Sequence, residues 1–333
     1  MAGDKVLQVS QIGLESVAGT QVAANRALLG MSLGMAREGG GLTPFRPEGY
    51  RAPVLTKPTN REFTNVPVEL ISDYRSLTWL LDSLLYKATA SQQGGTIAYS
   101  RTYTFDANAV PGARNTYTLE RGDSSLASYA TYTVFSGLGV THNREDVAMS
   151  ATAFAGKRVD GHTLTAAPTE ISVQPILASQ GSVYLESTLA ALSGATALTR
   201  LVELEWHFNA ASKGRFSANS DTSFSETTWL APEIGGTLKL WKNSAAMAIR
   251  TAAQAGTRKW LRLKYYGGVI ASSYHWTLQI TTPIEFTEPG DEADDDDALA
   301  MTFGFTSVHD ATAGYAAEIV LMNDINGSYA IAT

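Results

Sequence analysis

The chain has 333 residues, of which 44% are hydrophobic, so it can bury a core and form about two domains. Charged residues make up 17% and the net charge is −7, which excludes the basic face that a nucleic-acid binder needs for phosphates. The sequence contains no cysteine, so disulfides and thiolate metal sites are excluded as well.

Tyrosine and phenylalanine dominate the aromatic residues, with 14 and 11 copies, and threonine, serine and glycine are abundant. These residue types favour strands and turns, so we expect a mainly β protein. The first residues lack the basic and apolar regions of a signal peptide, and the apolar stretch 27–35 is too short to span a bilayer. We therefore expect no cleaved signal and no membrane contact.

Residues 1–61 are predicted to form an extended N-terminal arm. They show no apolar periodicity, and three consecutive glycines at 39–41 and prolines at 44, 47, 53 and 58 interrupt regular structure. A segment of this length without secondary structure is usually either disordered or ordered by a partner. Both alternatives are open at this point.

A helix is predicted after a strand that begins at Val66. Ser72 or Asp73 can cap its N-terminus. Five leucines follow with the spacing of one helix face: Leu77, Leu80, Leu81, Leu84 and Leu85. The helix therefore lies on a core.

Strands are predicted over most of the remaining chain. The clearest alternation is LVELEWHFN at 201–209, in which Leu204, Trp206 and Phe208 share one face. A second helix is expected after the strand at 237–241, with Asn243 or Ser244 as its cap and Gly256 at its end. The other predicted strands cover 115–122, 128–142, 146–159, 258–266, 274–288 and 298–310.

The order of these elements predicts an internal repeat. A strand followed by a helix occurs twice, as VELISD at 68–73 and as LKLWKN at 238–243. The strand at 129–142 matches the strand at 274–288, and DVAMSATAFAG matches ALAMTFGFTS with Met149 opposite Met301. We therefore expect two tandem β-sandwich or barrel domains, at 62–195 and 196–333, each with one flanking helix.

No catalytic, cofactor or zinc motif is present. The histidines are scattered, at 142, 162, 207, 275 and 309, without the spacing of metal ligands. The chain also lacks a nucleophile elbow and a phosphate-binding loop. We expect no enzyme, no cofactor and no metal, although paired carboxylates of a glycosidase cannot be recognised along a chain.

The densest charge is an acidic run between two predicted strands: Asp291, Glu292, Asp294, Asp295, Asp296 and Asp297. One interpretation is a solvated hairpin tip that resists aggregation. Another is a calcium site, although the run lacks the glycine and terminal glutamate of a calcium loop. A third is a repulsive loop that lines a channel, or lies between rings, and prevents a polyanion from adhering.

The segment GLESVAGTQVAAN carries Glu15, Gly19 and Thr20 in an E-x-x-x-G-T pattern followed by small residues. It resembles the N-terminal segment of tail tube proteins, the major tail proteins of long-tailed, non-contractile bacteriophages. The resemblance covers the arm well and the two domains in outline.

The resemblance implies a structural virion protein of tail-tube fold. It would self-assemble into stacked rings around a channel for double-stranded DNA, without specific DNA binding. Two tube domains per chain would give a trimeric ring with pseudo-sixfold symmetry, whereas a decorating second domain would give a hexamer. Its other partners would be the tape measure, terminator and distal tail proteins, and it would be made in the host cytoplasm.

In this interpretation Glu15, Gly19 and Thr20 belong to an assembly arm that becomes ordered against a neighbouring chain. The alternative from a different class is a β-sandwich protein, monomeric or oligomeric, that binds or hydrolyses a glycan.

Overall fold

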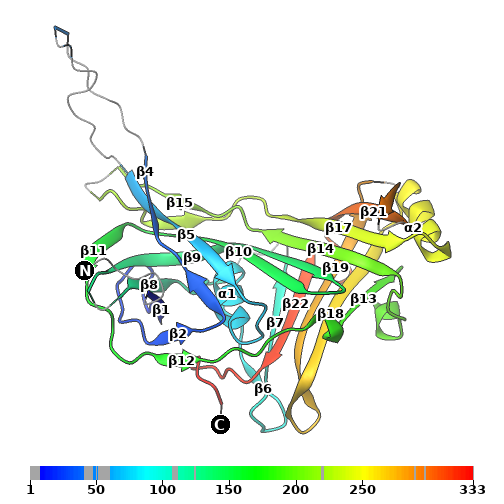
Figure 1. The fold of residues 1–333 in the computed structure, drawn as a ribbon, viewed down its shortest axis with the longest axis horizontal. Coiled ribbons are helices and arrows are strands. Elements are labelled where there is room, and N and C mark those ends of the chain that lie inside the picture. Colours follow the sequence, from blue (N-terminus) through cyan, green and yellow to red (C-terminus); the bar gives the residue numbers. More distant parts are fainter. Residues whose placement is uncertain are drawn as a thin grey trace.

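The computed structural model describes residues 8–40, 48–49, 51, 61–106, 112–123, 125–218, 221–288, 290–295 and 298–332. The protein is mainly β, as predicted (Figure 1). The elements of the N-terminal half are β1 (Val9–Leu14), β2 (Arg26–Leu28), β3 (Met31–Leu33), β4 (Ala36–Gly40), β5 (Arg61–Leu70), α1 (Leu77–Leu84), β6 (Ser91–Gln92), β7 (Tyr99–Phe105), β8 (Tyr117–Gly122), β9 (Ala127–Asn143), β10 (Val147–Ala155), β11 (Arg158–His162) and β12 (Thr169–Ile171).

The C-terminal half contains the longest hairpin and the second helix. Its elements are β13 (Gly181–Glu186), β14 (Leu201–Asn209), β15 (Lys213–Arg215), β16 (Glu226–Thr228), β17 (Glu233–Trp241), α2 (Ser244–Gln254), β18 (Lys259–Ala271), β19 (Tyr274–Phe286), β20 (Asp291–Asp295), β21 (Ala298–Ser307) and β22 (Ala317–Asn323). Short 3₁₀ turns cover Ala178–Gln180 and Ala190–Ser193.

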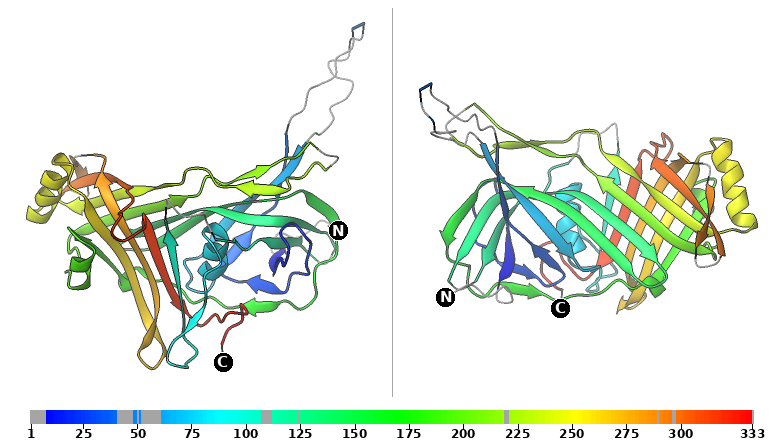
Figure 2. Two further views of the ribbon diagram at one scale, coloured as in Figure 1. Left: turned by 180° about the vertical axis from the view of Figure 1, so that it is seen from behind. Right: turned by 45° about the horizontal axis from the view of Figure 1, so that its top comes forward.

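One extended antiparallel sheet runs the length of the molecule (Figures 1 and 2). β3 and β4 pair with β5, which pairs with β10, and β10 pairs with the second half of β9. β9 pairs with β14, β14 with β17, and β17 with β21. β21 pairs with β20 and with the end of β19, and β19 continues the sheet to β18 and β13.

Two further groups of strands complete the body. The first half of β9 pairs with β8 and β11, β8 pairs with β1, and β2 joins β1 to the parallel strand β12. On the other side, β22 joins β19 to β7, which pairs with β6. Most buried hydrophobic side chains of these strands form one cluster that extends through both halves of the chain, and Trp260 of β18 packs in a smaller cluster with Leu192 and Tyr315.

The pairing order is the same in two groups of strands. In the first strand set (β3, β4, β5, β8, β9 and β10) the order of neighbours is β3/β4, β5, β10, β9, β8. In the second strand set (β14, β17, β18, β19, β20 and β21) it is β14, β17, β21, β19/β20, β18. A helix follows the strand in the second position in both sets, α1 after β5 and α2 after β17.

The N-terminal prediction is wrong for residues 9–40. These residues form β1–β4, and Ile12, Leu28, Met31 and Leu33 are buried in the common core. The strands are short and pair with β5 and β8, so the apolar pattern is too brief to show along the chain. Most of residues 41–60, which contain all four prolines of the predicted arm, lie outside the described residues.

Other predictions are confirmed. α1 occupies the predicted helix, and Leu77, Leu80, Leu81 and Leu84 are fully buried. β9 and β10 form the predicted hairpin. The alternation in β14 buries Leu204, Trp206 and Phe208, and Asn243 caps α2 by accepting a hydrogen bond from the Ala246 N–H.

Candidate assembly surfaces

The Glu15 carboxylate lies at the end of β1 and binds its own chain. Oε2 accepts hydrogen bonds from the Gly19 N–H and the Thr116 hydroxyl, both at 2.7 Å. Oε1 accepts from the Tyr132 N–H at 2.9 Å and from the Thr118 hydroxyl at 3.1 Å. The motif residue Glu15 therefore fixes the turn after β1 against β8 and β9.

The turn at Gly19 and Thr20 is exposed. Gly19 has φ +80°, a conformation that glycine adopts without strain, and the Thr20 N–H donates to the Val17 carbonyl at 3.0 Å. Val17 at the tip is 63% exposed. The E-x-x-x-G-T pattern thus has an internal structural role in Glu15 and presents an apolar side chain to the outside.

Glu15 also supports the bend where β9 passes from one sheet to the next. Tyr132 at this point has φ +58°, which a bulky residue adopts only when its surroundings impose it. Its N–H is one of the four donors to Glu15. The carboxylate therefore stabilises the position at which β9 leaves β8 and joins β10 and β14.

The acidic run forms a strand rather than a loop alone. Asp291–Asp295 is β20, which pairs with β21 from Asp291 opposite Thr302 to Asp295 opposite Ala298. Asp296 and Asp297, at the turn of this hairpin, lie outside the described residues. The predicted tip therefore begins after Asp295, and the preceding acidic residues occupy a strand.

Cations next to β20 pair with two of its carboxylates. The Glu292 carboxylate lies 2.6 Å from Lys242 Nζ and 3.3 Å from Arg250 Nη1, and the hydrogen bond from Lys242 lowers the pKa of Glu292. Asp295 lies 2.8 Å from Lys239 Nζ. Within the described part of the chain, no ion pair is found for Asp294, which is exposed.

Basic residues surround β4 at the opposite end of the sheet. Arg37 and Lys157 both pair with Glu62, and Arg37, followed by Lys157, lowers the pKa of this carboxyl. The Arg158 guanidinium donates to the Met35 carbonyl at 3.3 Å and pairs with Asp160 at 2.7 Å. Arg158, Asp160 and Arg121 line a depression of about 580 Å³ beside Gly34–Ala36.

Two buried carboxylates have roles that the sequence did not reveal. Glu120 on β8 accepts from the Gln11 amide at 2.8 Å, from both the N–H and the hydroxyl of Thr165, and from the Ala24 N–H. Burial alone would raise the pKa of Glu120, but these hydrogen bonds outweigh it and lower the pKa. Because its donors come from β1 and from loops far apart in the sequence, Glu120 joins these segments.

Asp82 on α1 is the other buried carboxylate. It accepts a hydrogen bond from the Tyr103 hydroxyl at 2.7 Å and another from the Tyr329 hydroxyl, and burial raises its pKa. The side chain is fully buried, so substrate cannot reach it. This network attaches the C-terminal residues to α1.

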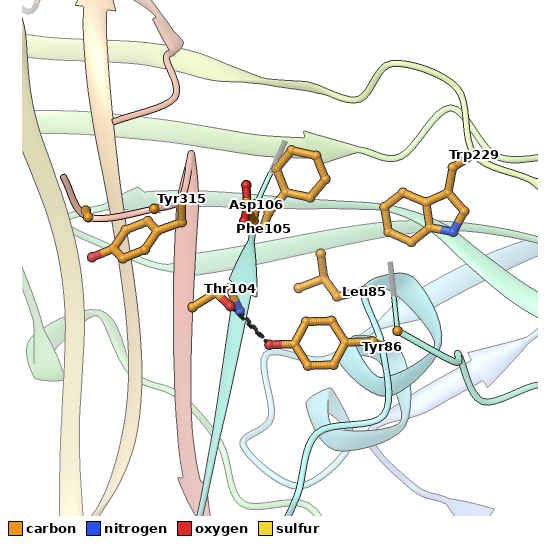
Figure 3. A pocket seen from close by; sticks show the side chains of 10 residues that line it. Leu85, Tyr86, Thr104, Phe105, Asp106, Trp229 and Tyr315 are labelled. Atoms are coloured by element: carbon orange, nitrogen blue, oxygen red, sulfur yellow. Dashed lines mark hydrogen bonds between the residues drawn. The ribbon is translucent and has the colours of Figure 1, made fainter. Parts of the chain in front are cut away.

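An aromatic pocket of about 360 Å³ lies between α1 and the C-terminal half (Figure 3). Tyr86, Phe105, Trp229 and Tyr315 line it, and the Tyr86 hydroxyl accepts a hydrogen bond from the Thr104 N–H at 2.8 Å. Phe105 and Trp229 are stacked with ring centroids 6.4 Å apart. It is the aromatic cavity relevant to the glycan-binding alternative.

The described residues contain no group of three or more metal-ligating side chains. No helix among them is long and apolar enough to cross a membrane. The chain matches no known family model, and a search of curated proteins finds no relative.

Proposed function

We propose that this protein is a structural virion protein whose copies assemble into stacked rings that form the hollow tail tube of a long-tailed bacteriophage. The observation that carries the proposal is the repeated pairing order of the two strand sets, joined side by side through β9 and β14. Within one chain, β14 of the second strand set pairs with β9 of the first set. Copies of the chain could associate through the same kind of strand pairing and so form a polymer. The resemblance of the segment around Glu15, Gly19 and Thr20 to tail tube proteins gives the polymer its biological class.

A duplicated tube domain would explain the agreement between the two sets. Leu70 on β5 and Leu240 on β17 hold matching positions. Leu240 is opposite Met301, and the register in which Val68 is opposite Ala151 continues to Leu70 opposite Met149. Met149 and Met301 are the two methionines that the repeat aligns. Three residues after each leucine, a polar side chain accepts the N–H three positions further on: Asp73 from Ser76, and Asn243 from Ala246. The proposed domain at 62–195 then gains the preceding strands β3 and β4, which correspond to β14 at the start of the domain at 196–333.

Two such domains per chain favour a trimeric ring with pseudo-sixfold symmetry over a hexamer. Head-to-tail contacts of this kind close into rings when the rotation per subunit allows it. The channel would pass double-stranded DNA without specific binding, in keeping with the net charge of −7. The proposal includes no catalytic step and no cofactor. It assigns the protein to the virion, with tape measure, terminator and distal tail proteins as further partners.

Sedimentation velocity over a range of protein concentrations tests this proposal. We expect the purified chain to form a discrete oligomer of three chains and larger stacked species. A monomer at all concentrations would contradict a tube-forming role.

The aromatic pocket supports a second candidate, a glycan-binding protein. Stacked aromatic faces such as Phe105 and Trp229 are surfaces on which sugar rings can pack. Titration calorimetry with bacterial cell-wall glycans would detect this activity. Binding that is lost in Trp229→Ala, by a chain that stays monomeric, would favour the glycan-binding function over the tube.

A further inference from the structure

The junction between β9 and β14 shows how one strand set adds to the next. Seven residue pairs join them, from Glu203 opposite Asn143 to Asn209 opposite Gly137. The Ala210 N–H continues the ladder by donating to the Ser136 carbonyl at 2.8 Å. The first strand of the second set is therefore added to the outer edge of β9.

The two edges equivalent to this junction, β3/β4 and β20, carry no ladder on their outer side among the described residues. β3 and β4 pair with β5 as β14 pairs with β17, but no described strand forms a ladder on their other side. Two side chains contact this side: the Ser10 hydroxyl accepts from the Leu33 N–H at 3.2 Å, and Arg158 donates to the Met35 carbonyl at 3.3 Å. β20 pairs with β21 as the second half of β9 pairs with β10, and its other side is also unpaired. The two edges lie at opposite ends of the molecule, β20 beside α2 (Figures 1 and 2).

The backbone groups on both edges point outward in matching positions. The Gly34 N–H donates to Pro67 on β5, so the alternate residues Met35 and Arg37 direct their N–H and C=O groups away from β5. The Lys242 N–H donates to Leu299, so Ala298, Ala300 and Thr302 of β21 face β20. Their partners are Asp295, Ala293 and Asp291, which leaves Glu292 and Asp294 pointing outward.

The β14–β9 junction also gives the register that β4 and β20 of two copies would have if they paired in the same way. Met149 is opposite Val140, and Met301 is opposite Glu292, so Glu292 takes the place of Val140. Asn65 is opposite Ala36, and Gly235, its counterpart in β17, is opposite His207. Because His207 is opposite Gly139, Ala36 would lie opposite Asp291, and Met35 opposite Glu292.

The charges at the two edges are complementary. β4 contains Arg37 and Glu38 and lies beside Arg121 and Arg158, and two of these arginines are paired, Arg37 with Glu62 and Arg158 with Asp160. β20 contains Asp291, Glu292, Asp294 and Asp295. Glu292 pairs with Lys242 and Arg250, and Asp295 pairs with Lys239. Counting these groups and Lys157, the β4 edge keeps a net positive charge and the β20 edge a net negative charge. An edge with this charge repels a second β20 and attracts a basic edge, which favours head-to-tail over symmetric pairing.

We propose that β4 of one chain pairs antiparallel with β20 of the next copy of this chain, in the register of the β14–β9 junction, with Ala36 opposite Asp291. This inference rests on the proposed function, because it requires the copies to associate. It assigns the acidic strand to a contact within the ring rather than to the wall of the channel.

Disulfide cross-linking tests the register, and the absence of native cysteine removes any background. Ala36 and Asp291 would form a pair without direct backbone hydrogen bonds, in which Cα atoms are about 4.5 Å apart and a disulfide fits. We expect the variant A36C/D291C to give covalent dimers and trimers on mild oxidation. The matched control is A36C/D294C, whose second cysteine lies on the other face of the strand and should not cross-link.

Mixing the two single variants shows that the bond joins different chains. A36C mixed with D291C should give covalent dimers and nothing larger, whereas either variant alone should stay uncross-linked. Hydrogen exchange of the unmodified protein gives a second measurement that needs no substitution. The backbone amides of Met35, Arg37, Glu292 and Asp294 should become protected when dilute monomers assemble.

The outcomes separate this inference from the proposed function. An oligomer that forms without the cross-link, and without new protection in residues 34–37 and 290–295, would overturn the β4–β20 pairing and leave the tube in place. A chain that never associates would overturn both. Cross-linking in A36C/D294C instead of A36C/D291C would overturn the proposed register.

Discussion

The helix of the first strand set is enclosed, whereas the helix of the second set lies on the outside of the molecule (Figure 2). All eight residues of α1 are buried, but of the eleven residues of α2 only Ala246 and Ile249 are. The difference comes from what covers each helix. α1 meets β8 through the hydrogen bond of the Tyr117 hydroxyl to the Trp79 carbonyl, and meets the C-terminal segment through Tyr329.

The comparison shows that helices in equivalent positions of the two strand sets can be stabilised in different ways. α1 is part of the core, and its stability comes from burial of leucine side chains. α2 is alanine-rich and short, so it depends on its cap and on helix propensity. The charged residues near α2 also act at the surface, since Lys242 and Arg250 form ion pairs with Glu292 on the edge strand β20.

The largest expected effect is on the leucine face of α1. Leu81→Ala removes a fully buried side chain and should lower the free energy of unfolding by about 2–5 kcal/mol. Met247→Ala on α2, where the side chain is 41% exposed, should change it by less than about 0.5 kcal/mol. Chemical denaturation of both variants measures the difference. Equal effects would mean that the two helices are equally enclosed.

The next effect concerns the buried carboxylate of the first set. Glu120→Gln replaces an acceptor with an amide that also donates, facing donors from Gln11, Ala24 and Thr165, and should cost about 1–3 kcal/mol. The exposed Glu292→Gln is the matched control and should leave the melting temperature nearly unchanged.

The pH dependence follows from the direction of the Glu120 shift. The folded-state pKa of this carboxyl lies below its ordinary value of 4.5, so the unfolded state binds the proton more tightly. The stability that Glu120 contributes is present above pH 4.5 and is lost as the pH falls through the folded-state pKa. Melting temperatures of the wild type should therefore fall more steeply with acid than those of Glu120→Gln. Parallel curves would show that another group causes the acid sensitivity.

The caps should give a smaller effect. Asn243→Ala removes the side chain that accepts the Ala246 N–H and should destabilise the protein by about 1 kcal/mol. Asn243→Asp, in which the aspartate can accept the same hydrogen bond, should keep the stability of the wild type. Failure of Asn243→Asp to recover the melting temperature would mean that the cap does not stabilise α2.

The smallest effect is expected for the acidic strand. Replacing Asp294 and Asp295 with asparagine removes one partly buried ion pair, between Asp295 and Lys239, and should change the free energy of unfolding by less than about 1 kcal/mol. The same variant should associate more weakly, because β20 loses charge that faces a basic edge. A large loss of stability in the isolated chain would show that the strand belongs to the core.

The elements that the sequence predicted are those whose hydrophobic spacing or capping residue can be recognised within one short segment. The leucine spacing identified α1, the alternation in 201–209 identified β14, and Asn243 was recognised as a cap. The chain order of strands and helices predicts an internal repeat, and this stays a prediction. The strand β20 was predicted as part of a loop. The chain bulges between Phe286 and Asp291, so the continuity of β19 and β20 along β21 is not visible in the residues.

The rest depends on contacts between distant residues. The strands of 9–40 are stabilised by β5 and β8, so their apolar residues give no periodic signal of their own. The partners of Glu15 lie at Thr116, Thr118 and Tyr132, and the donors to Glu120 are equally remote. The arginines at β4 come from three separate strands, so they do not form a basic run in the sequence: Arg37, Arg121 and Arg158.

Electron microscopy of the purified chain tests the central claim most directly. If copies join head to tail as the two strand sets join within one chain, negatively stained samples will show hollow rings of three chains with six similar lobes, and stacks of such rings. Single elongated particles of one chain, at concentrations at which sedimentation shows no heavier species, would contradict the account.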